Sequence, residues 1–187
     1  MDNNISDYKR KSFIEQGEIY FWTATINKWQ YLLKGDAYKN IVVNSLKYLS
    51  DAGKIDVFAF VIMPNHIHLI WRINNQNGKE TAQGSFLKYT AHEFKKMINS
   101  GKGLVKLSDY AVEASNKNYE FWQRDSLAVN LYSRDVAYQK MEYIHLNPLT
   151  VHWQLAKEPS DYKYSSARFY ETATKEFSFL KDLRDEF

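Results

Sequence analysis

One short stretch constrains the fold more than any other part of the chain: residues 58–72 read FAFVIMPNHIHLIWR. Residues 57–63 form a nearly unbroken apolar run that is rich in β-branched and aromatic side chains, which is typical of a buried β-strand. The following dipeptide, Pro64-Asn65, favours a turn, so a second strand is expected to return over residues 66–73. The sequence therefore predicts two consecutive strands in the interior of the protein.

The second of these strands carries two histidines, His66 and His68. Because side chains alternate along a strand, the two imidazoles share one face, while the opposite face takes Ile67, Leu69 and Trp71. Two neighbouring imidazoles can bind one metal ion, and at least one more ligand must then come from elsewhere in the chain. The spacing alone leaves another interpretation open, in which these are unrelated strand histidines that are satisfied by hydrogen bonds.

A helix is predicted about 65 residues further on, over residues 133–147, with the sequence SRDVAYQKMEYIHLN. Ser133 is a good N-cap, and the stripe that would face the core consists of Ala137, Met141 and Ile144. Pro148 should end the helix and push the residue before it out of helical geometry.

Two polar side chains on this predicted helix are candidates for chemistry. Tyr143 and Asn147 are four residues apart, so they are neighbours on one flank. Tyr143 lies about 100° around the helix from Ile144, off the core stripe, and is free to face a cleft. Taken alone, Tyr143 could equally be a packing residue, since the chain has 14 tyrosines.

The two motifs together, MPNHIHLI and YIHLNP, resemble the REP-associated tyrosine transposases, which belong to the HUH single-strand nucleases. The similarity continues through FWQRD at residues 121–125 and EPSDYKYSSAR at residues 158–168. By this resemblance His66 and His68 are metal ligands and Tyr143 is the nucleophile. Asn147 takes the place of the third ligand, where related transposases of small insertion sequences use glutamine. Ser126 stands where family members often have an aromatic residue.

The resemblance also implies a reaction, a cofactor and a partner. A divalent metal ion, Mg²⁺ or Mn²⁺, would offset the negative charge of a phosphodiester, and both ions accept an octahedral shell. Cleavage of single-stranded or hairpin DNA would leave a covalent 5′-phosphotyrosine and a free 3′-hydroxyl. Such a protein would be a monomer or a homodimer and would act in the cytoplasm of a prokaryote, associated with the nucleoid.

Composition sets the class of protein. The chain has 187 residues, so we expect one domain over residues 1–187, with a flexible arm at 1–16 and a C-terminal tail at 149–187. Hydrophobic residues make up 44% of the chain, which indicates a globular fold. There is no cysteine, which excludes disulfides and thiolate metal sites. Neither a membrane span nor a signal peptide is expected, and a net charge of +3 permits a nucleic-acid partner without requiring one.

The order of predicted elements defines a fold class. These elements are a strand at 19–26, a helix at 37–52 with Asp36 as its N-cap, strands at 57–63 and 66–73, a helix at 81–99, one or two strands within 119–132, and the tyrosine helix. The order βαββαβ is that of a ferredoxin-like antiparallel sheet, an α+β fold. Its third strand is central, so the histidines should lie in the middle of the sheet. The added C-terminal helix that carries Tyr143 should lie across the sheet face.

Further residues in the second half of the chain are weaker candidates for DNA contacts. They are basic or aromatic, a mixture that suits phosphate contacts and base stacking: Trp122, Arg124, Lys157, Tyr162, Lys163, Tyr164 and Arg168. A core position for Trp122, and a C-terminal tail that simply folds back on the sheet, are equally compatible with the sequence.

Two other functions remain open at this point. One is a catalytically idle DNA-hairpin binder that keeps the site for folding or recognition. The other is an unrelated metal hydrolase that uses the H-x-H pair, although the α/β-barrel version of such an enzyme needs about 250 residues. Intact His66, His68 and Tyr143 favour the cleaving and joining enzyme over the idle binder.

Overall fold

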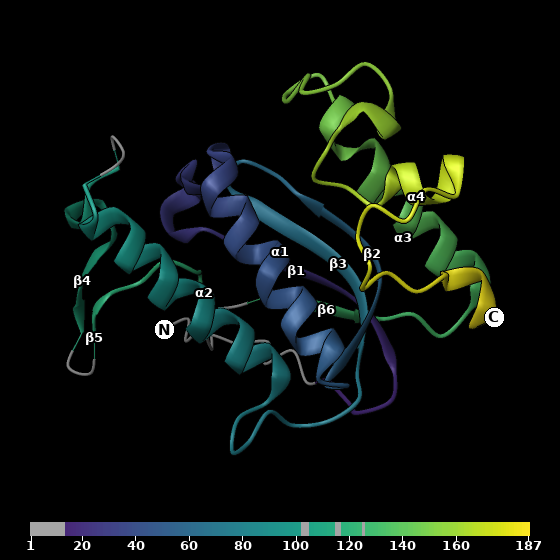
Figure 1. Ribbon diagram of the computed structural model, residues 1–187, viewed down its shortest axis with the longest axis horizontal. Coiled ribbons are helices and arrows are strands. Elements are labelled where there is room, and N and C mark those ends of the chain that lie inside the picture. The colour runs from purple at the N-terminus through teal and green to yellow at the C-terminus, as the bar shows by residue number, and fades with distance from the viewer. Residues whose placement is uncertain (1–13, 102–104, 115–116, 125) are drawn as a thin grey trace, which may run out of the picture.

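The computed structural model describes residues 14–101, 105–114, 117–124 and 126–187. Its central element is a four-stranded sheet in the order β2-β3-β1-β6, in which every neighbouring pair is antiparallel (Figure 1). The strands are β1 (Ile19–Thr25), β2 (Ile55–Ile62), β3 (His66–Ile73) and β6 (Leu127–Asn130). The helices are α1 (Asp36–Asp51), α2 (Ala82–Asn99), α3 (Arg134–Leu146) and α4 (Ala167–Thr172).

This arrangement confirms the predicted α+β, ferredoxin-like fold. β1, α1, β2, β3, α2 and β6 follow one another along the chain, and β3 lies between β2 and β1 in the sheet. The first two helices pack on each other; α1 also packs on β2, and Phe86 of α2 contacts Trp22 of β1 and Trp71 of β3. A separate hairpin of β4 (Ala111–Ala114) and β5 (Lys117–Tyr119) stands apart from the sheet, beside one end of α2 (Figure 1).

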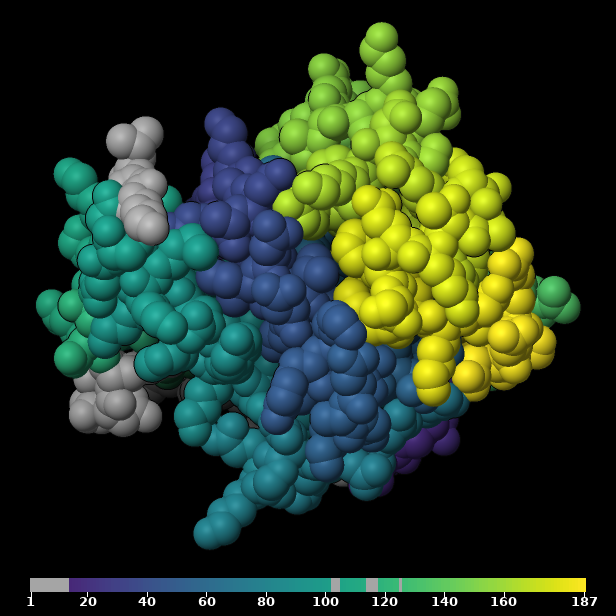
Figure 2. All heavy atoms as spheres, viewed as in Figure 1, coloured from purple at the N-terminus to yellow at the C-terminus, as the bar shows by residue number. Residues whose placement is uncertain are grey.

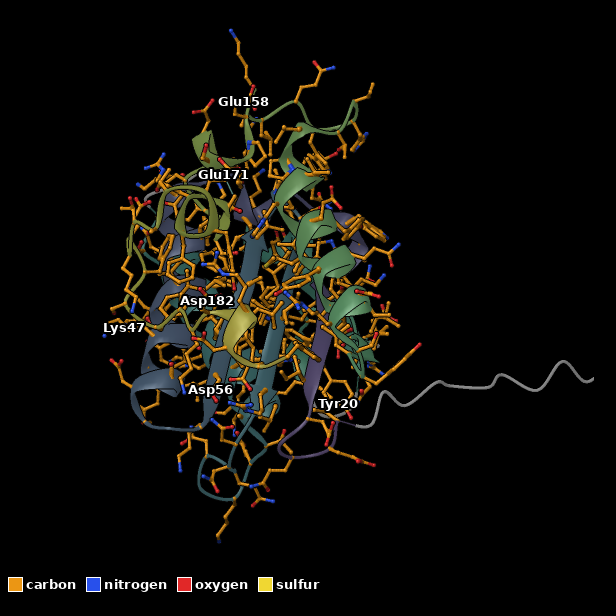
Figure 3. All side chains as sticks on the ribbon, turned by 90° about the vertical axis from the view of Figure 1, so that its right-hand side faces the viewer. Tyr20, Lys47, Asp56, Glu158, Glu171 and Asp182 are labelled. Atoms are coloured by element: carbon orange, nitrogen blue, oxygen red, sulfur yellow. The ribbon has the colours of Figure 1, made fainter. Side chains whose placement is uncertain are left out.

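The sheet separates two hydrophobic cores. Figure 3 shows the sheet between α1 on one side and α3 on the other. The core under α1 and α2 is rich in aromatic residues; Trp22 stacks on Trp71 there, with ring centroids 4.8 Å apart. The core under α3 is smaller and includes Phe21, Ala137 and Ile144. The sheet face toward α3 is also the face that carries the two histidines.

The residues directly after α3 extend beyond the end of the sheet, and the later ones fold back along it (Figure 1). Residues 162–166 pair with the outer edge of β2, where the amide of Ile62 donates to Tyr164 O at 2.9 Å and Ser166 N donates to Phe60 O at 2.9 Å. In Figure 2 the yellow C-terminal residues form one continuous surface beside the blue surface of α1. An exposed strand edge invites pairing with other chains, so this cover protects β2.

Several predicted boundaries match and one cap is wrong. Ser133 caps α3 as expected, because its Oγ accepts from Val136 N at 3.4 Å. Asp36, however, is the first residue of α1 and not its cap; Gly35 precedes the helix and has no side chain to cap it. The carboxylate of Asp36 pairs instead with Lys39 one turn later, at 3.6 Å.

Two further expectations concern the ends of the chain and the membrane. Most of the predicted N-terminal arm, residues 1–13, lies outside the described residues. Within the part of the chain that the structure describes, every helix is too short or too polar to cross a bilayer.

Candidate functional site

The pairing of β1 with β3 fixes the two histidines. His66 lies opposite Thr25 and His68 opposite Thr23 in the antiparallel register. The two imidazoles point to the α3 side of the sheet, with ring centroids 4.7 Å apart. Ile67 and Leu69, which alternate with them along β3, belong to the opposite core. The predicted alternation along β3 is therefore confirmed, and the two imidazoles lie side by side.

Each imidazole is held by a hydrogen bond at Nδ1. Nδ1 of His66 lies 2.6 Å from Oδ1 of Asn65. Because an amide oxygen can only accept, Nδ1 of His66 carries the hydrogen and Nε2 keeps its lone pair. Nδ1 of His68 lies 2.7 Å from the hydroxyl of Thr23, which can take the same acceptor role. Such partners at the far nitrogen are what orient metal-binding histidines in known sites.

Burial keeps both rings neutral. Desolvation lowers the pKa of His66 to about 4. Desolvation, with a smaller contribution from the charges of His66 and Lys140, lowers the pKa of His68 to about 3. Neutral imidazole is the form that binds a metal ion, so at neutral pH both rings are in the form that can bind one.

The tyrosine helix brings Tyr143 to this pair. The Tyr143 ring lies edge-on to His68, with centroids 5.2 Å apart, and also contacts Phe21 at 5.9 Å. Tyr143 is 48% exposed, so a substrate can reach its hydroxyl. On the preceding turn, Nζ of Lys140 lies 5.8 Å from the Tyr143 ring centroid and 5.1 Å from that of Phe21. A tyrosine, a positive charge and an imidazole are thus gathered at one point.

Asn147 is buried one turn beyond Tyr143, and its Oδ1 has no hydrogen-bond partner. Nε2 of His68 is likewise buried and without a partner. The expectation that Pro148 would push Asn147 out of helical geometry is wrong. Asn147 has φ −54° and ψ −43°, and the chain continues in a 3₁₀ turn (Asn147–Leu149) with Pro148 near its start, a position that tolerates proline. Helical geometry therefore extends through Asn147 and keeps it on the flank of Tyr143.

These unpartnered atoms provide a test of whether a cation fits. Buried polar atoms are normally satisfied, and with a hydrogen on Nδ1 of each ring the two Nε2 atoms and the amide oxygen would be three acceptors with no donor among them. The other buried atoms without partners, Nε1 of Trp22 and Nε1 of Trp71, are donors in the opposite core. Among the described residues, no group of three His, Cys, Asp or Glu side chains could hold a metal ion. His66, His68 and the amide of Asn147 therefore remain the predicted donor set for a cation.

The structure gives most of the predicted DNA-binding aromatic residues internal roles. Trp122 is buried among core rings and its Nε1 donates to Oγ1 of Thr90 at 2.9 Å. The hydroxyl of Tyr162 donates to Ile62 O at 2.8 Å, and burial raises its pKa. Tyr164 is also buried. Trp122 and Tyr164 therefore pack in the interior, whereas Tyr162 is partly buried and bonded through its hydroxyl.

The predicted basic residues remain at or near the surface. Lys157 and Lys163 are exposed, and Nζ of Lys163 lies 3.9 Å from a carboxylate oxygen of Asp36. The guanidinium of Arg124 pairs with Glu120 at 3.0 Å. Arg168 is partly buried; its Nε donates to a backbone carbonyl at 3.0 Å and its Nη1 lies 3.4 Å from a glutamate oxygen. Exposed ion pairs of this kind are weak, so these side chains can exchange partners.

Three residues at the site were missed by sequence reasoning: Thr23, Asn65 and Lys140. Thr23 could have been found, because an antiparallel pairing of the first and third strands places it opposite His68. Asn65 was assigned only to the turn. Lys140 is three residues before Tyr143, which places both on one flank of a helix. No sequence motif marks Lys140 as a site residue.

Comparison with known proteins identifies the fold. No family model matches the chain, and no curated protein sequence matches it. Among solved structures, a REP-associated tyrosine transposase bound to a REP hairpin superposes with a TM-score of 0.58 and 18% identity, covering 96% of this chain and 93% of that one. A protein of Deinococcus radiodurans R1 that has been proposed to be a transposase gives a TM-score of 0.43 and 14% identity, over 72% of this chain and 92% of its own. The first match has the same fold as this chain, in agreement with the resemblance seen in the two motifs.

Proposed function

We propose that this protein is a metal-dependent transposase or endonuclease that cuts and rejoins single-stranded DNA through Tyr143. One observation carries the proposal: the half-exposed Tyr143 ring lies 5.2 Å from His68, whose buried Nε2 has no hydrogen-bond partner. A packing tyrosine would not require an unsatisfied imidazole beside it. A nucleophile that attacks a phosphate held by a metal ion would require a metal-binding imidazole beside it.

Three side chains would hold the ion, namely His66, His68 and Asn147. Two neutral nitrogens and one amide oxygen leave coordination positions for phosphate and water, and Mn²⁺ tolerates nitrogen ligands better than Mg²⁺. When bound, the ion would offset the negative charge of the phosphate oxygens and orient the group. Asn65 and Thr23 would keep the two rings in position through Nδ1.

Tyr143 would carry out the covalent step. Its phenolic oxygen attacks the scissile phosphorus, the bond from phosphorus to the 3′ oxygen breaks, and a 5′-phosphotyrosine forms. The phenolic proton is lost to solvent, and the departing 3′ oxygen takes one up. Because the phosphotyrosine bond conserves the energy of the phosphodiester, strands can be rejoined without ATP. Lys140 would add a positive charge beside the phosphate.

A single strand suits this site better than a duplex does. The phosphate must enter the corner between α3 and the sheet, and a flexible strand can turn a phosphate into that corner. Exposed Lys157, Lys163 and Arg124 would contact the rest of the DNA, at a hairpin of the kind that the structurally similar transposase binds.

The test is a cleavage assay on single-stranded hairpin DNA with Mn²⁺, followed by mass spectrometry of the trapped adduct. We expect the wild-type adduct on Tyr143, and Tyr143→Phe should lower cleavage by at least about 1,000-fold, since the nucleophile is removed while its ring is kept. Tyr138→Phe, the same change on the same helix, is the matched control and should retain cleavage. A blunt duplex should be a poor substrate.

Two outcomes would contradict the proposal. If Tyr143→Phe cleaves at the wild-type rate, the metal hydrolase becomes the better interpretation. If the wild type binds hairpins tightly and forms no adduct with any metal, the protein is the catalytically idle hairpin binder.

A further inference from the structure

The five tryptophans of the chain lie either in the interior or near one end of the molecule. Of the five in the chain, Trp22, Trp71 and Trp122 are buried in the core under α1 and α2. The remaining two, Trp29 and Trp153, lie in the segments that follow β1 and α3. Both segments lie toward the upper end of the molecule in Figure 1, the end where the histidine motif begins.

These two segments carry an aromatic surface, made of Trp29, Tyr31 and Trp153, that reaches the candidate site. The Trp153 ring lies 6.0 Å from the His66 ring, and on its other side it contacts Tyr31 edge-on at 5.8 Å. Trp29 and Tyr31 are 60% and 54% exposed. Large aromatic rings gain stability when they are buried, so their exposure here is not explained by folding.

The backbone around these rings is strained. Four non-glycine residues in the described part of the chain have positive φ, and three of them belong to these two segments: Lys28 (55°), Trp29 (56°) and Gln154 (46°). Non-glycine residues rarely adopt such angles, and they cluster at ligand-binding sites.

One side chain ties the first segment to a candidate metal ligand. The Asn65 amide donates through Nδ2 to Trp29 O at 3.4 Å, while its Oδ1 accepts from His66. Leu33 N also donates to Pro64 O, at 2.9 Å. The aromatic surface therefore has a fixed position relative to the histidines.

We propose that Trp29, Tyr31 and Trp153 form a stacking platform for the bases that flank the phosphate held at His66 and His68. This inference rests on the proposed function and adds the part of the substrate that the metal site does not contact. Every nucleobase has an aromatic face, so the platform would bind a single strand with little sequence preference. In a duplex these faces are covered by neighbouring bases, so the platform discriminates against duplex DNA.

A nucleic-acid strand is favoured over a protein partner for two reasons. The surface adjoins a site whose chemistry suits a phosphodiester, and it carries an exposed cation, Lys28, next to Trp29 in the chain. Rings and a cation side by side match a strand that alternates bases with phosphates.

The test compares two probes with the same number of phosphates: a 12-nucleotide oligo(dT) and a 12-unit abasic strand. Both would be measured with metal-free protein by fluorescence anisotropy, so that cleavage plays no part. We expect the wild type to bind oligo(dT) about 10-fold more tightly or better. Trp153→Ala and Trp29→Ala should bring this ratio toward one and leave the affinity for the abasic strand unchanged.

Control variants distinguish a loss of base stacking from a general disruption of the fold. Trp153→Phe keeps an aromatic face and should keep most of the preference. Tyr48→Ala and Tyr89→Ala remove equally exposed rings from α1 and α2, across the sheet from the candidate site, and should have no effect. If Trp153→Ala does not fold, Tyr31→Ala serves in its place, since more than half of that side chain is already exposed.

The outcomes distinguish the platform from the nuclease. Equal wild-type affinity for the two probes overturns the platform, even if the Tyr143 adduct forms. A strong preference for oligo(dT) without any adduct supports the platform and counts against the nuclease. Failure to bind either probe overturns both. Self-association that masks Trp29 in the absence of DNA would make this surface an interface between two copies and would also overturn the platform.

Discussion

Three histidines of this protein have a lowered pKa, and they occupy two regions that differ in bonding. His66 and His68 lie between β3 and α3, and His145 lies on α3 itself, facing the segment that covers the edge of β2. Desolvation lowers the pKa of His145 to about 4, as it does for His66. All three rings are therefore neutral at pH 7.

The two regions differ in what the ring nitrogens contact. Nε2 of His145 shares a hydrogen bond of 2.8 Å with the hydroxyl of Ser166, whose oxygen also accepts from Phe60 N at 3.0 Å. His145 therefore links α3 to the C-terminal segment through this hydrogen bond. Nε2 of His68 has no partner. A lowered pKa alone would mark both regions as functional; the missing partner singles out the pair on β3.

The largest expected effect comes from removing one histidine of each region. His68→Ala should weaken Mn²⁺ binding by more than about 100-fold, because a ligand is lost. His145→Ala should leave Mn²⁺ affinity within about 3-fold, but should lower the free energy of unfolding by about 1–3 kcal/mol, because Ser166 loses its buried partner. Calorimetric titration and urea denaturation measure the two quantities separately. Equal losses of Mn²⁺ affinity in both variants would show that the two regions do not differ in metal binding.

A smaller effect is expected from the residue that orients His68. Thr23→Val removes the acceptor of the Nδ1 hydrogen bond while keeping the shape of the side chain. Mn²⁺ affinity should fall by about 10–100-fold, the usual loss when such a partner of a metal ligand is removed. Thr25→Val, the same change two residues along β1, is the control and should have a smaller effect. Unchanged affinity in Thr23→Val would mean that packing alone orients the ring.

The sequence predicted the sheet and the pair of histidines because period-two alternation and an apolar run are local signals. His66 and His68 follow from that alternation, and Ser133 as a cap follows from its position before a periodic stretch. The pairing order follows from the succession of strands and helices. The tyrosine helix was predicted to the residue at its N-terminal cap for the same local reason.

What the sequence could not predict depends on contacts between distant segments. Trp122 and Tyr162 look like DNA-binding residues beside basic neighbours, yet tertiary packing gives them buried hydrogen bonds. Asn147 before a proline looked non-helical, and a 3₁₀ turn accommodates it. The aromatic surface of Trp29 and Trp153 joins segments more than 100 residues apart in the chain, so no local pattern indicates it.

The smallest expected effect is a change in how the free energy of unfolding depends on pH. His145 has a folded-state pKa of about 4 against an ordinary value of 6.5, so between these values the unfolded state binds one more proton than the folded state. Its neutral form contributes stability fully above pH 6.5, and that contribution is lost as the pH falls toward 4. Each such histidine adds up to about 1.4 kcal/mol per pH unit to the slope of stability against pH. His145→Gln should therefore flatten the slope by up to that amount in metal-free protein.

Urea unfolding at pH 4.5, 5.5, 6.5 and 7.5 would measure this slope (about one pH unit per step). Above pH 7 the wild-type and His145→Gln curves should run parallel, separated only by the loss of the bond to Ser166, because neither state of His145 gains a proton there. Below pH 6.5 they should converge, since the variant no longer has a buried ring to be protonated on unfolding. Curves that stay parallel down to pH 4.5 would show that His145 takes up its proton while folded. In that case His145 would be more open to solvent than its contacts with Ser166 and Tyr170 imply, and the contrast with His66 and His68 would rest on bonding alone.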